Sequence, residues 1–238
     1  MTIGCFIDYD NIDAVEKAVG IKDLVTVIYS KLEDSFKHQN LRMYVRFYGG
    51  WYDTNGQLTR DAIVLSSQIE DTFPFVLTQR AIKGNPHKTI CNAEMAYSLL
   101  EIPGDILYNT FRHKSVNHTY LRVERGSNLG CSLEGCTADI IYKTIKKKKC
   151  TNSSCTKTTS DFLYRNEQKM IDTMISCDLI YGASIYDKVI IVSSDDDFVP
   201  VLKTLLNKRK DVELFETKIN SDIKTKYNLQ ITTKNIKI

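Results

Sequence analysis

The sequence predicts an open α/β fold in which a mainly parallel sheet is flanked by helices. Two short apolar runs carry this prediction, residues 3–7 and residues 189–192, because unbroken runs of this kind are typical of strands buried on both faces. Between the two runs, strand-like and helix-like patterns alternate along the chain. That alternation is typical of a parallel sheet with right-handed crossover connections.

The remaining elements follow from the spacing of apolar side chains. Residues 12–37 repeat them at helical spacing, with Gly20 as an interruption, and residues 41–48 alternate as a strand that Gly49 and Gly50 end. The other expected strands are residues 75–77, 120–123 and 212–215, and the other expected helices are residues 58–69, 93–100, 166–181 and the segment around 201–206.

Length and composition favour one large domain, residues 1–238, with an inserted segment at residues 110–160. The tail, residues 218–238, is polar and its structure is not predicted. A net charge of +3 is too small to indicate nucleic acid by itself. No apolar run approaches the roughly 20 residues of a membrane span, and the first acids come too early for a signal peptide. Seven cysteines, an odd count, favour a reducing, cytoplasmic setting.

The second apolar run leads directly into three consecutive carboxylates, Asp195, Asp196 and Asp197. Helix capping offers one explanation, because Ser194-x-x-Asp197 resembles a capping box and Pro200 suits a first helical turn. Capping explains one or two acids, whereas three adjacent ones repel each other. A site that holds a divalent metal through oxygen ligands explains all three.

The first apolar run also ends in polar groups, Asp8, Asp10 and Asn11. If both strands are central and adjacent, their carboxyl ends meet at a topological switch point, where open α/β sheets bind ligands. The two acidic strand ends therefore predict one shared site.

Asp178 falls inside the apolar arc of the expected helix at residues 166–181. A carboxylate in an apolar stripe needs a partner. Two explanations stay open, a hydrogen bond to backbone near the site and direct participation in chemistry. Lys169 and Asp172, three residues apart, are open to a simpler explanation as a surface ion pair.

Four cysteines form two matched pairs within the inserted segment. Their spacing, with a short segment between the pairs, suits four thiolate ligands of a structural zinc ion, although four unligated thiols are the alternative. His113 and His118 are further candidates for ligands. The pairs are Cys131 with Cys136 and Cys150 with Cys155.

Basic residues indicate where a phosphate backbone would bind. A run of four lysines lies between the cysteine pairs, and it is either a solvated loop tip or a phosphate contact. Arg42 and Arg46 share one strand face by alternation. The full set of candidates is Arg42, Arg46, Arg80, Lys83, Lys146, Lys147, Lys148 and Lys149.

Three stretches, in chain order, resemble the motifs of NYN domains, which belong to the PIN-like nuclease superfamily. They are Phe6–Asn11, the K-x-x-D of residues 169–172 with Asp178 six residues later, and Ser193–Pro200. Ser194 stands where the family usually has glycine.

The resemblance covers residues 1–90 and 160–216, and it leaves the four-cysteine segment as an insertion. It implies an endoribonuclease that hydrolyses single-stranded or structured RNA, acting alone, as a homo-oligomer or in a larger assembly. It implies Mg²⁺ or Mn²⁺ held by Asp8, Asp172, Asp195 and Asp197, with Asn11, Ser193 and Asp178 also at the site.

Two other functions remain open. Asp8-Tyr9-Asp10 also reads as the D-x-D of haloacid-dehalogenase-type phosphatases, although Asn11 follows where that family has threonine or valine before an apolar residue. The second alternative is an RNA-binding module that keeps the nuclease fold without turnover.

Overall fold

The computed structural model divides the chain into two compact units, which are described separately. Unit 1 is Met1–Thr110 together with Lys169–Ile238, and unit 2 is Phe111–Gln168. The structure describes residues 1–32, 40–53, 55–79, 86–108, 111–115, 133, 136–161, 163–168, 170–218 and 222–236.

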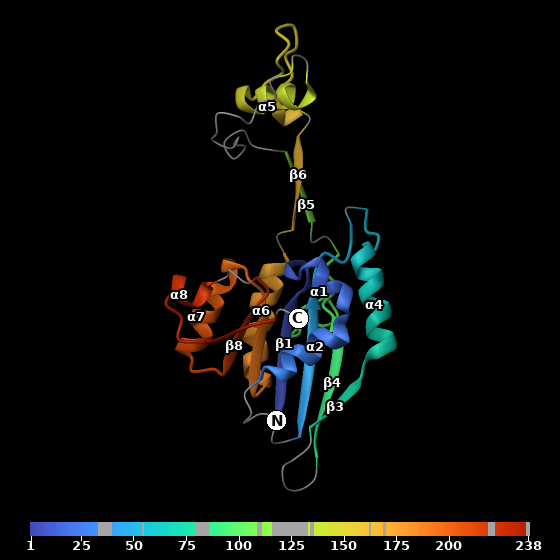
Figure 1. The fold of residues 1–238 in the computed structure, drawn as a ribbon, viewed down its shortest axis with the longest axis vertical. Coiled ribbons are helices and arrows are strands. Elements are labelled where there is room, and N and C mark those ends of the chain that lie inside the picture. Colours follow the sequence, from blue (N-terminus) through green and yellow to red (C-terminus); the bar gives the residue numbers. More distant parts are fainter. Residues whose placement is uncertain are drawn as a thin grey trace. The chain divides into compact units, whose positions relative to one another are not determined.

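Unit 1 is built on a seven-stranded sheet of order β3-β4-β2-β1-β7-β8-β9 (Figure 1). Every neighbouring pair is parallel except β3 and β4, which are antiparallel. The expected open, mainly parallel α/β sheet is therefore confirmed. The strands are β1 Thr2–Asp8, β2 Leu41–Tyr48, β3 Phe75–Gln79, β4 His87–Met95, β7 Lys188–Val192, β8 Val212–Glu216 and β9 Thr232–Asn235.

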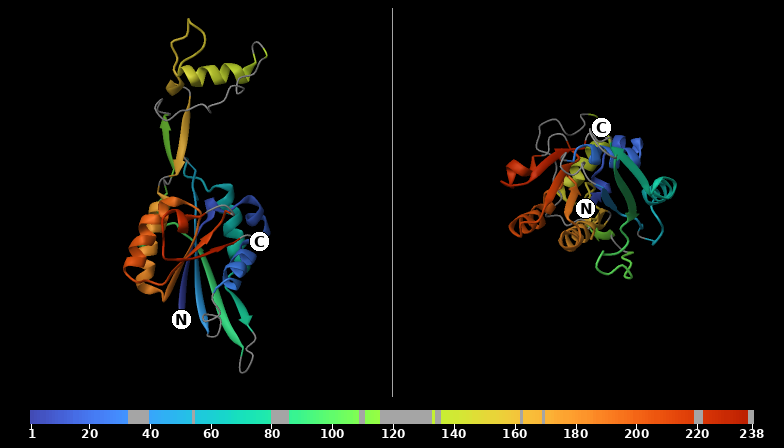
Figure 2. Two further views of the ribbon diagram at one scale, coloured as in Figure 1. Left: turned by 60° about the vertical axis from the view of Figure 1, so that its left-hand side comes forward. Right: turned by 90° about the horizontal axis from the view of Figure 1, so that it is seen from below.

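Helices cover both faces of this sheet (Figure 2). Because side chains alternate along a strand, Ile3, Cys5 and Ile7 of β1 enter one core while Phe6 enters the other. The first core includes α2 and α4, and the second includes α6 and α7. The helices of unit 1 are α1 Ala14–Val19, α2 Ile21–Ser30, α4 Arg60–Thr72, α6 Ile171–Ile185, α7 Val199–Asn207 and α8 Ile223–Lys226.

Local chemistry sets several helix ends. Gly20 has φ 100°, a conformation that side chains disfavour, and it separates α1 from α2 as the sequence predicted. Thr59 caps α4, because its hydroxyl accepts a hydrogen bond from the Ala62 amide at 3.3 Å. Of the helix expected over residues 12–37, residues 33–37 lie outside the described part of the chain.

One predicted helix is wrong, and another is wrong in part. Residues 93–95 belong to β4, which pairs with β2 from Leu41↔Thr89 to Phe47↔Met95, so the expected helix at 93–100 is not formed. Pairing with a distant strand overrides the helix-like local pattern. The helix expected from residue 166 begins only at Ile171. The tail, left unassigned by the sequence, supplies α8 and β9.

Among its described residues, unit 2 contains an antiparallel pair of strands and one α-helix. The strands β5 Phe111–Ser115 and β6 Tyr164–Gln168 pair from Phe111↔Gln168 to Ser115↔Tyr164. The helix α5 spans Thr137–Lys147. The segment expected as an insertion, 110–160, falls almost wholly within this unit. The strand expected at 120–123 lies outside the described residues.

Candidate active site at the carboxyl ends of β1 and β7

The two acidic strand ends meet in the middle of the sheet. β1 pairs with β7 in parallel, with Ile7 opposite Val192, so Asp8 and Ser193 follow as neighbours. On its other side β1 pairs with β2. The chain runs from β1 to β2 on one side and from β7 to β8 on the other, which defines a topological switch point between β1 and β7.

Asp8 is a buried carboxylate held by neutral donors. It is 3% exposed, and its Oδ2 accepts hydrogen bonds from Asn11 Nδ2 at 2.9 Å and from Ser193 Oγ at 3.0 Å. Burial raises the pKa of this carboxyl above its ordinary value, and these two hydrogen bonds only partly counteract the effect. Within the described residues, Asp8 has no lysine or arginine as an ion-pair partner. The described part of the chain therefore supplies no cation that compensates its negative charge.

Ser193 also connects Asp8 to the loop that follows β7. Its hydroxyl oxygen accepts a hydrogen bond from the Asp195 amide at 3.1 Å, and Asp195 Oδ1 accepts one from the Asp197 amide at 3.1 Å. Asp195 is half-buried and Asp197 is exposed. This chain of hydrogen bonds fixes the loop beside Asp8.

The other polar residues of this loop contact the tail. Asp196 binds Lys226 and accepts a hydrogen bond from Tyr227 Oη at 2.8 Å, and both contacts lower the pKa of Asp196. Ser194 Oγ accepts hydrogen bonds from the amides of Thr217 and Lys218. The three consecutive aspartates therefore have different surroundings: Asp195 and Asp197 belong to the hydrogen-bonded loop beside Asp8, and Asp196 contacts the tail.

Helix capping accounts for part of this pattern. Asp195 caps the short 3-10 turn Asp196–Phe198 through the Asp197 amide. Ser194, the expected partner of a capping box, instead joins the ends of β7 and β8. The capping box suggested by Ser194-x-x-Asp197 is therefore not formed.

Asp10, in the turn that follows β1, is hydrogen-bonded to the turn that follows β2. Its Oδ2 accepts a hydrogen bond from the Gly50 amide at 3.1 Å. A methyl group at Gly49 would lie 2.7 Å from the Trp51 ring and 3.1 Å from Asp10 Oδ1, so the close approach needs glycine there.

Asp172 lies at the same edge of the sheet. α6 leads into β7 through a short turn, so it runs antiparallel to the strands and its first turn falls at their carboxyl ends. Asp172 is in that first turn and is half-buried. Lys169, the other residue of the K-x-x-D motif, lies outside the described residues.

Asp178 has the partners that its apolar surroundings required. It is 1% exposed, and it accepts hydrogen bonds from Tyr48 Oη at 2.7 Å and from the Leu100 amide at 2.8 Å. Arg46 Nε lies 3.4 Å from its Oδ2. Burial is the largest influence on the carboxyl and raises its pKa. The hydrogen bond to backbone, one of the two explanations left open, is thus present.

The structure gives Arg46 a place inside the protein. It is buried, with Nη1 2.5 Å from Glu94 Oε1, and its Nη2 donates to the Ser98 carbonyl. Sequence reasoning missed Tyr48, Glu94 and Leu100 as members of this cluster; the alternation of residues 42–48 was the available signal for Tyr48.

Of the other basic candidates, Arg42 is exposed but pairs with Thr2, at the opposite end of the sheet from Asp8. Lys146 and Lys147 end α5, Lys148 follows in the left-handed conformation, and Lys149 bridges to Thr158. Arg80 and Lys83 lie outside the described residues.

The oxygen-rich edge suits a hard divalent cation. Mg²⁺ keeps several waters and binds proteins through one or two carboxylates, and Asp8 and Asp195, which Ser193 connects, are the carboxylates that could hold it. No group of three or more His, Cys, Asp or Glu residues able to hold a metal occurs within the described ranges. Cys136, Cys150 and Cys155, three of the four expected zinc ligands, are described and do not form such a group. Cys131, the fourth, lies outside the described ranges.

A family model supports the resemblance given by the motifs. The model of the NYN domain matches residues 131–231, a range that includes the second and third motifs and the cysteine pairs but not Phe6–Asn11. No curated protein and no solved structure matches the chain. The part of the chain that the structure describes contains no helix both long and apolar enough to cross a membrane.

Proposed function

We propose that this protein is a metal-dependent endoribonuclease, with its active site at the carboxyl ends of β1 and β7. The observation that carries the proposal is Asp8, a buried carboxylate without a cationic partner among the described residues. Burial of an unpaired charge is costly unless a bound ion compensates it. The NYN match, which covers residues 131–231 and not Asp8, supports a nuclease, and Asp8 is an expected ligand in the first of the three motifs that resemble this family.

Each residue of this site has a proposed role, either as an oxygen ligand of the metal or as a group that orients a ligand. Asn11 and Ser193 fix the orientation of the Asp8 carboxylate. Asp195 and Asp197 present further oxygens from the loop that Ser193 holds, and Asp172 adds one from the first turn of α6. When bound, Mg²⁺ or Mn²⁺ would activate a water and neutralise charge on the phosphoryl oxygens. We assign Asp178 a positioning role, because its carboxylate is occupied by Tyr48, Leu100 and Arg46.

Incubation of the full chain with RNA and with DNA, in Mn²⁺, Mg²⁺ or EDTA, tests the proposal. We expect internal cleavage of RNA that requires the metal and disappears in Asp8→Asn. Asp196→Asn is the matched control, because it also replaces an aspartate by asparagine at the carboxyl end of a central strand, but at a residue that contacts the tail. Binding of RNA without cleavage would indicate the binding module, and release of phosphate from a small phosphomonoester would indicate the phosphatase.

Unit 2 is proposed to contribute a zinc site and an RNA contact. Metal analysis of protein purified without chelator should find about one zinc per chain if Cys131 completes a four-thiolate site. Replacing Lys146, Lys147, Lys148 and Lys149 by serine should flatten the salt dependence of RNA binding, by about 0.7 in logarithmic slope for each phosphate that is no longer neutralised. An unchanged slope would leave the lysines as a solvated segment.

A further inference from the structure

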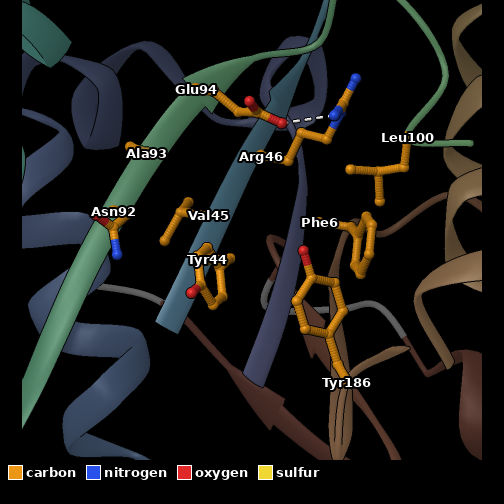
Figure 3. A pocket seen from close by; sticks show the side chains of 9 residues that line it. All are labelled: Phe6, Tyr44, Val45, Arg46, Asn92, Ala93, Glu94, Leu100 and Tyr186. Carbon is orange, nitrogen blue, oxygen red and sulfur yellow. Dashed lines mark hydrogen bonds and ion pairs between the residues drawn. The ribbon is translucent and has the colours of Figure 1, made fainter. Parts of the chain in front are cut away.

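A cavity of about 280 Å³ opens on the face of the sheet that α6 shares (Figure 3). It lies entirely within unit 1, and the proposed function does not use it. β1, β2 and β4 supply most of its wall. The side chains that matter for its chemistry are Phe6, Tyr44, Arg46, Asn92, Glu94 and Tyr186.

The cavity follows from how the helices are placed on this face. α6 packs on β1 and β7, and α7 packs on β8, so the neighbouring side chains of β2 and β4 are left to form a hollow. Tyr186, just after α6, forms one side, with its ring 6.3 Å from that of Phe6 and 5.7 Å from that of Tyr44. A methyl group at Gly4 would overlap the Tyr186 ring, so glycine makes this position of the ring possible.

Polar groups in the wall lack partners. None of the described residues hydrogen-bonds to the side chain of Asn92 or to the hydroxyl groups of Tyr44 and Tyr186. All three residues are half-buried. Half-buried polar groups that converge on a cavity favour a ligand with hydrogen-bonding atoms, because an apolar ligand would leave them unsatisfied.

A fixed charge pair closes one side of the cavity. Glu94 Oε1 faces Arg46 Nη1, as Figure 3 shows, and Arg46 is further held by the Ser98 carbonyl and by Asp178. The Glu94 side chain is still 58% exposed, so it remains accessible as an acceptor. The wall therefore combines aromatic rings, an amide, phenolic hydroxyls and a carboxylate.

We propose that this cavity binds one unpaired base of the substrate RNA, an inference that rests on the proposed function. Single-stranded RNA is commonly recognised by stacking of bases on aromatic side chains and by hydrogen bonds to the base edges. Tyr186 and Tyr44 supply the rings, and the Asn92 amide supplies both a donor and an acceptor. The volume of about 280 Å³ lies just below the roughly 300–1,000 Å³ typical of ligand pockets, which suits a single small planar group.

The position of the cavity relative to Asp8 supports the same ligand. Phe6 lines it, and Asp8 is the next residue of β1 on that face, about 7 Å further along the strand. One nucleotide of an extended strand covers a distance of that order. A base in the cavity would therefore belong to a nucleotide next to the phosphate that is cleaved.

The test compares the binding of two probes in EDTA, where cleavage does not occur. One probe is a short oligoadenylate that contains 2-aminopurine, and the other is an abasic RNA of the same length. We expect Tyr186→Leu to weaken binding of the oligoadenylate about 5- to 150-fold and to leave the abasic probe unaffected. Asn92→Leu should weaken it about 2- to 10-fold. Tyr186→Phe keeps the ring and should retain most of the affinity and the quenching of 2-aminopurine.

Tyr181→Leu on α6 and Asn207→Leu at the end of α7 are matched controls outside the cavity, and both should bind as wild type. Wild-type affinity and quenching in both Tyr186→Leu and Asn92→Leu would overturn the inference. If Tyr186→Leu does not fold, Asn92→Leu and Tyr186→Phe decide the question. Base-dependent binding without Mn²⁺-dependent cleavage would refute the nuclease and keep the cavity, whereas the reverse result would refute the cavity alone.

Discussion

Asp8, at the end of β1, and Asp178, in α6, are both buried aspartates, but their hydrogen-bond and ion-pair partners differ. Burial raises the pKa of each carboxyl. Asp178 has a cation, Arg46, in addition to two hydrogen-bond donors, whereas the described residues give Asp8 the neutral donors Asn11 and Ser193 and no cation. The difference separates a carboxylate that has a cationic partner in the fold, Asp178, from one that we propose binds a metal ion, Asp8.

The largest effect on stability is expected from replacing Asp178. Asp178→Leu removes one of the two carboxylates that neutralise the buried Arg46, and it leaves the Tyr48 hydroxyl and the Leu100 amide without their acceptor, which should lower the free energy of unfolding by about 3–5 kcal/mol. For a chain of this size, Tm should fall by about 6–20 °C in thermal unfolding. Adding Arg46→Met should restore part of the loss, because the second change removes a buried charge that only Glu94 would still neutralise. A loss of Tm in the double variant equal to the sum of the single losses would contradict the pairing.

The next largest effect, on the rate of RNA cleavage, is expected from Ser193→Ala, which removes a hydrogen bond to Asp8. Ser193 orients Asp8 and holds the Asp195 amide, and removal of such supporting hydrogen bonds typically costs about 10- to 100-fold in activity or metal affinity. We expect that decrease in the rate of RNA cleavage, with little change in far-UV circular dichroism. Cleavage at the wild-type rate would place the catalytic centre elsewhere.

The pH dependence of stability sharpens the comparison further. Because the pKa of Asp8 is raised above its ordinary value of 3.8, the unfolded chain releases this proton more readily than the folded protein. Without metal, wild-type stability should therefore fall as pH rises above 3.8 until the folded pKa is passed. Asp8→Asn lacks this loss, so its stability relative to wild type should increase over that window. Denaturant unfolding at several pH values measures it, and a pH-independent difference would refute the uncompensated charge.

The smallest effect is expected at Asp196. Its contacts with Lys226 and Tyr227 lie at the surface, where water and salt screen an ion pair. Asp196→Asn should leave RNA cleavage unchanged and lower Tm only slightly, with the difference vanishing in high salt. A marked decrease in cleavage with Tm maintained would place Asp196 in the catalytic centre.

Much of this comparison was predictable from sequence. Unbroken apolar runs predicted β1 and β7, and the acids that follow them predicted that Asp8 and the loop after Val192 would meet. The apolar arc of α6 indicated that Asp178 needs a partner. These features depend on periodicity and on the direction of parallel strands, which a single sequence encodes locally.

The identities of the partners were not predictable in the same way. Tyr48 and Leu100 are far from Asp178 in the chain, and only the folded sheet brings them together. Arg46 was expected to contact RNA because its charge alone does not reveal that Glu94 and Asp178 neutralise it. Likewise residues 93–95 have a helix-like pattern, and β4 forms there because β2 offers a parallel partner.

Titration of Mn²⁺ into the metal-free protein, followed by Tm, tests most directly whether the charge of Asp8 is kept for a cation. Mn²⁺ should stabilise wild type by RT ln(1 + [L]/Kd), about 2.7 kcal/mol at a concentration of 100 Kd. Asp8→Asn should lose most of this stabilisation, and Asp196→Asn should retain it. An equal rise of Tm in wild type and Asp8→Asn would contradict the account.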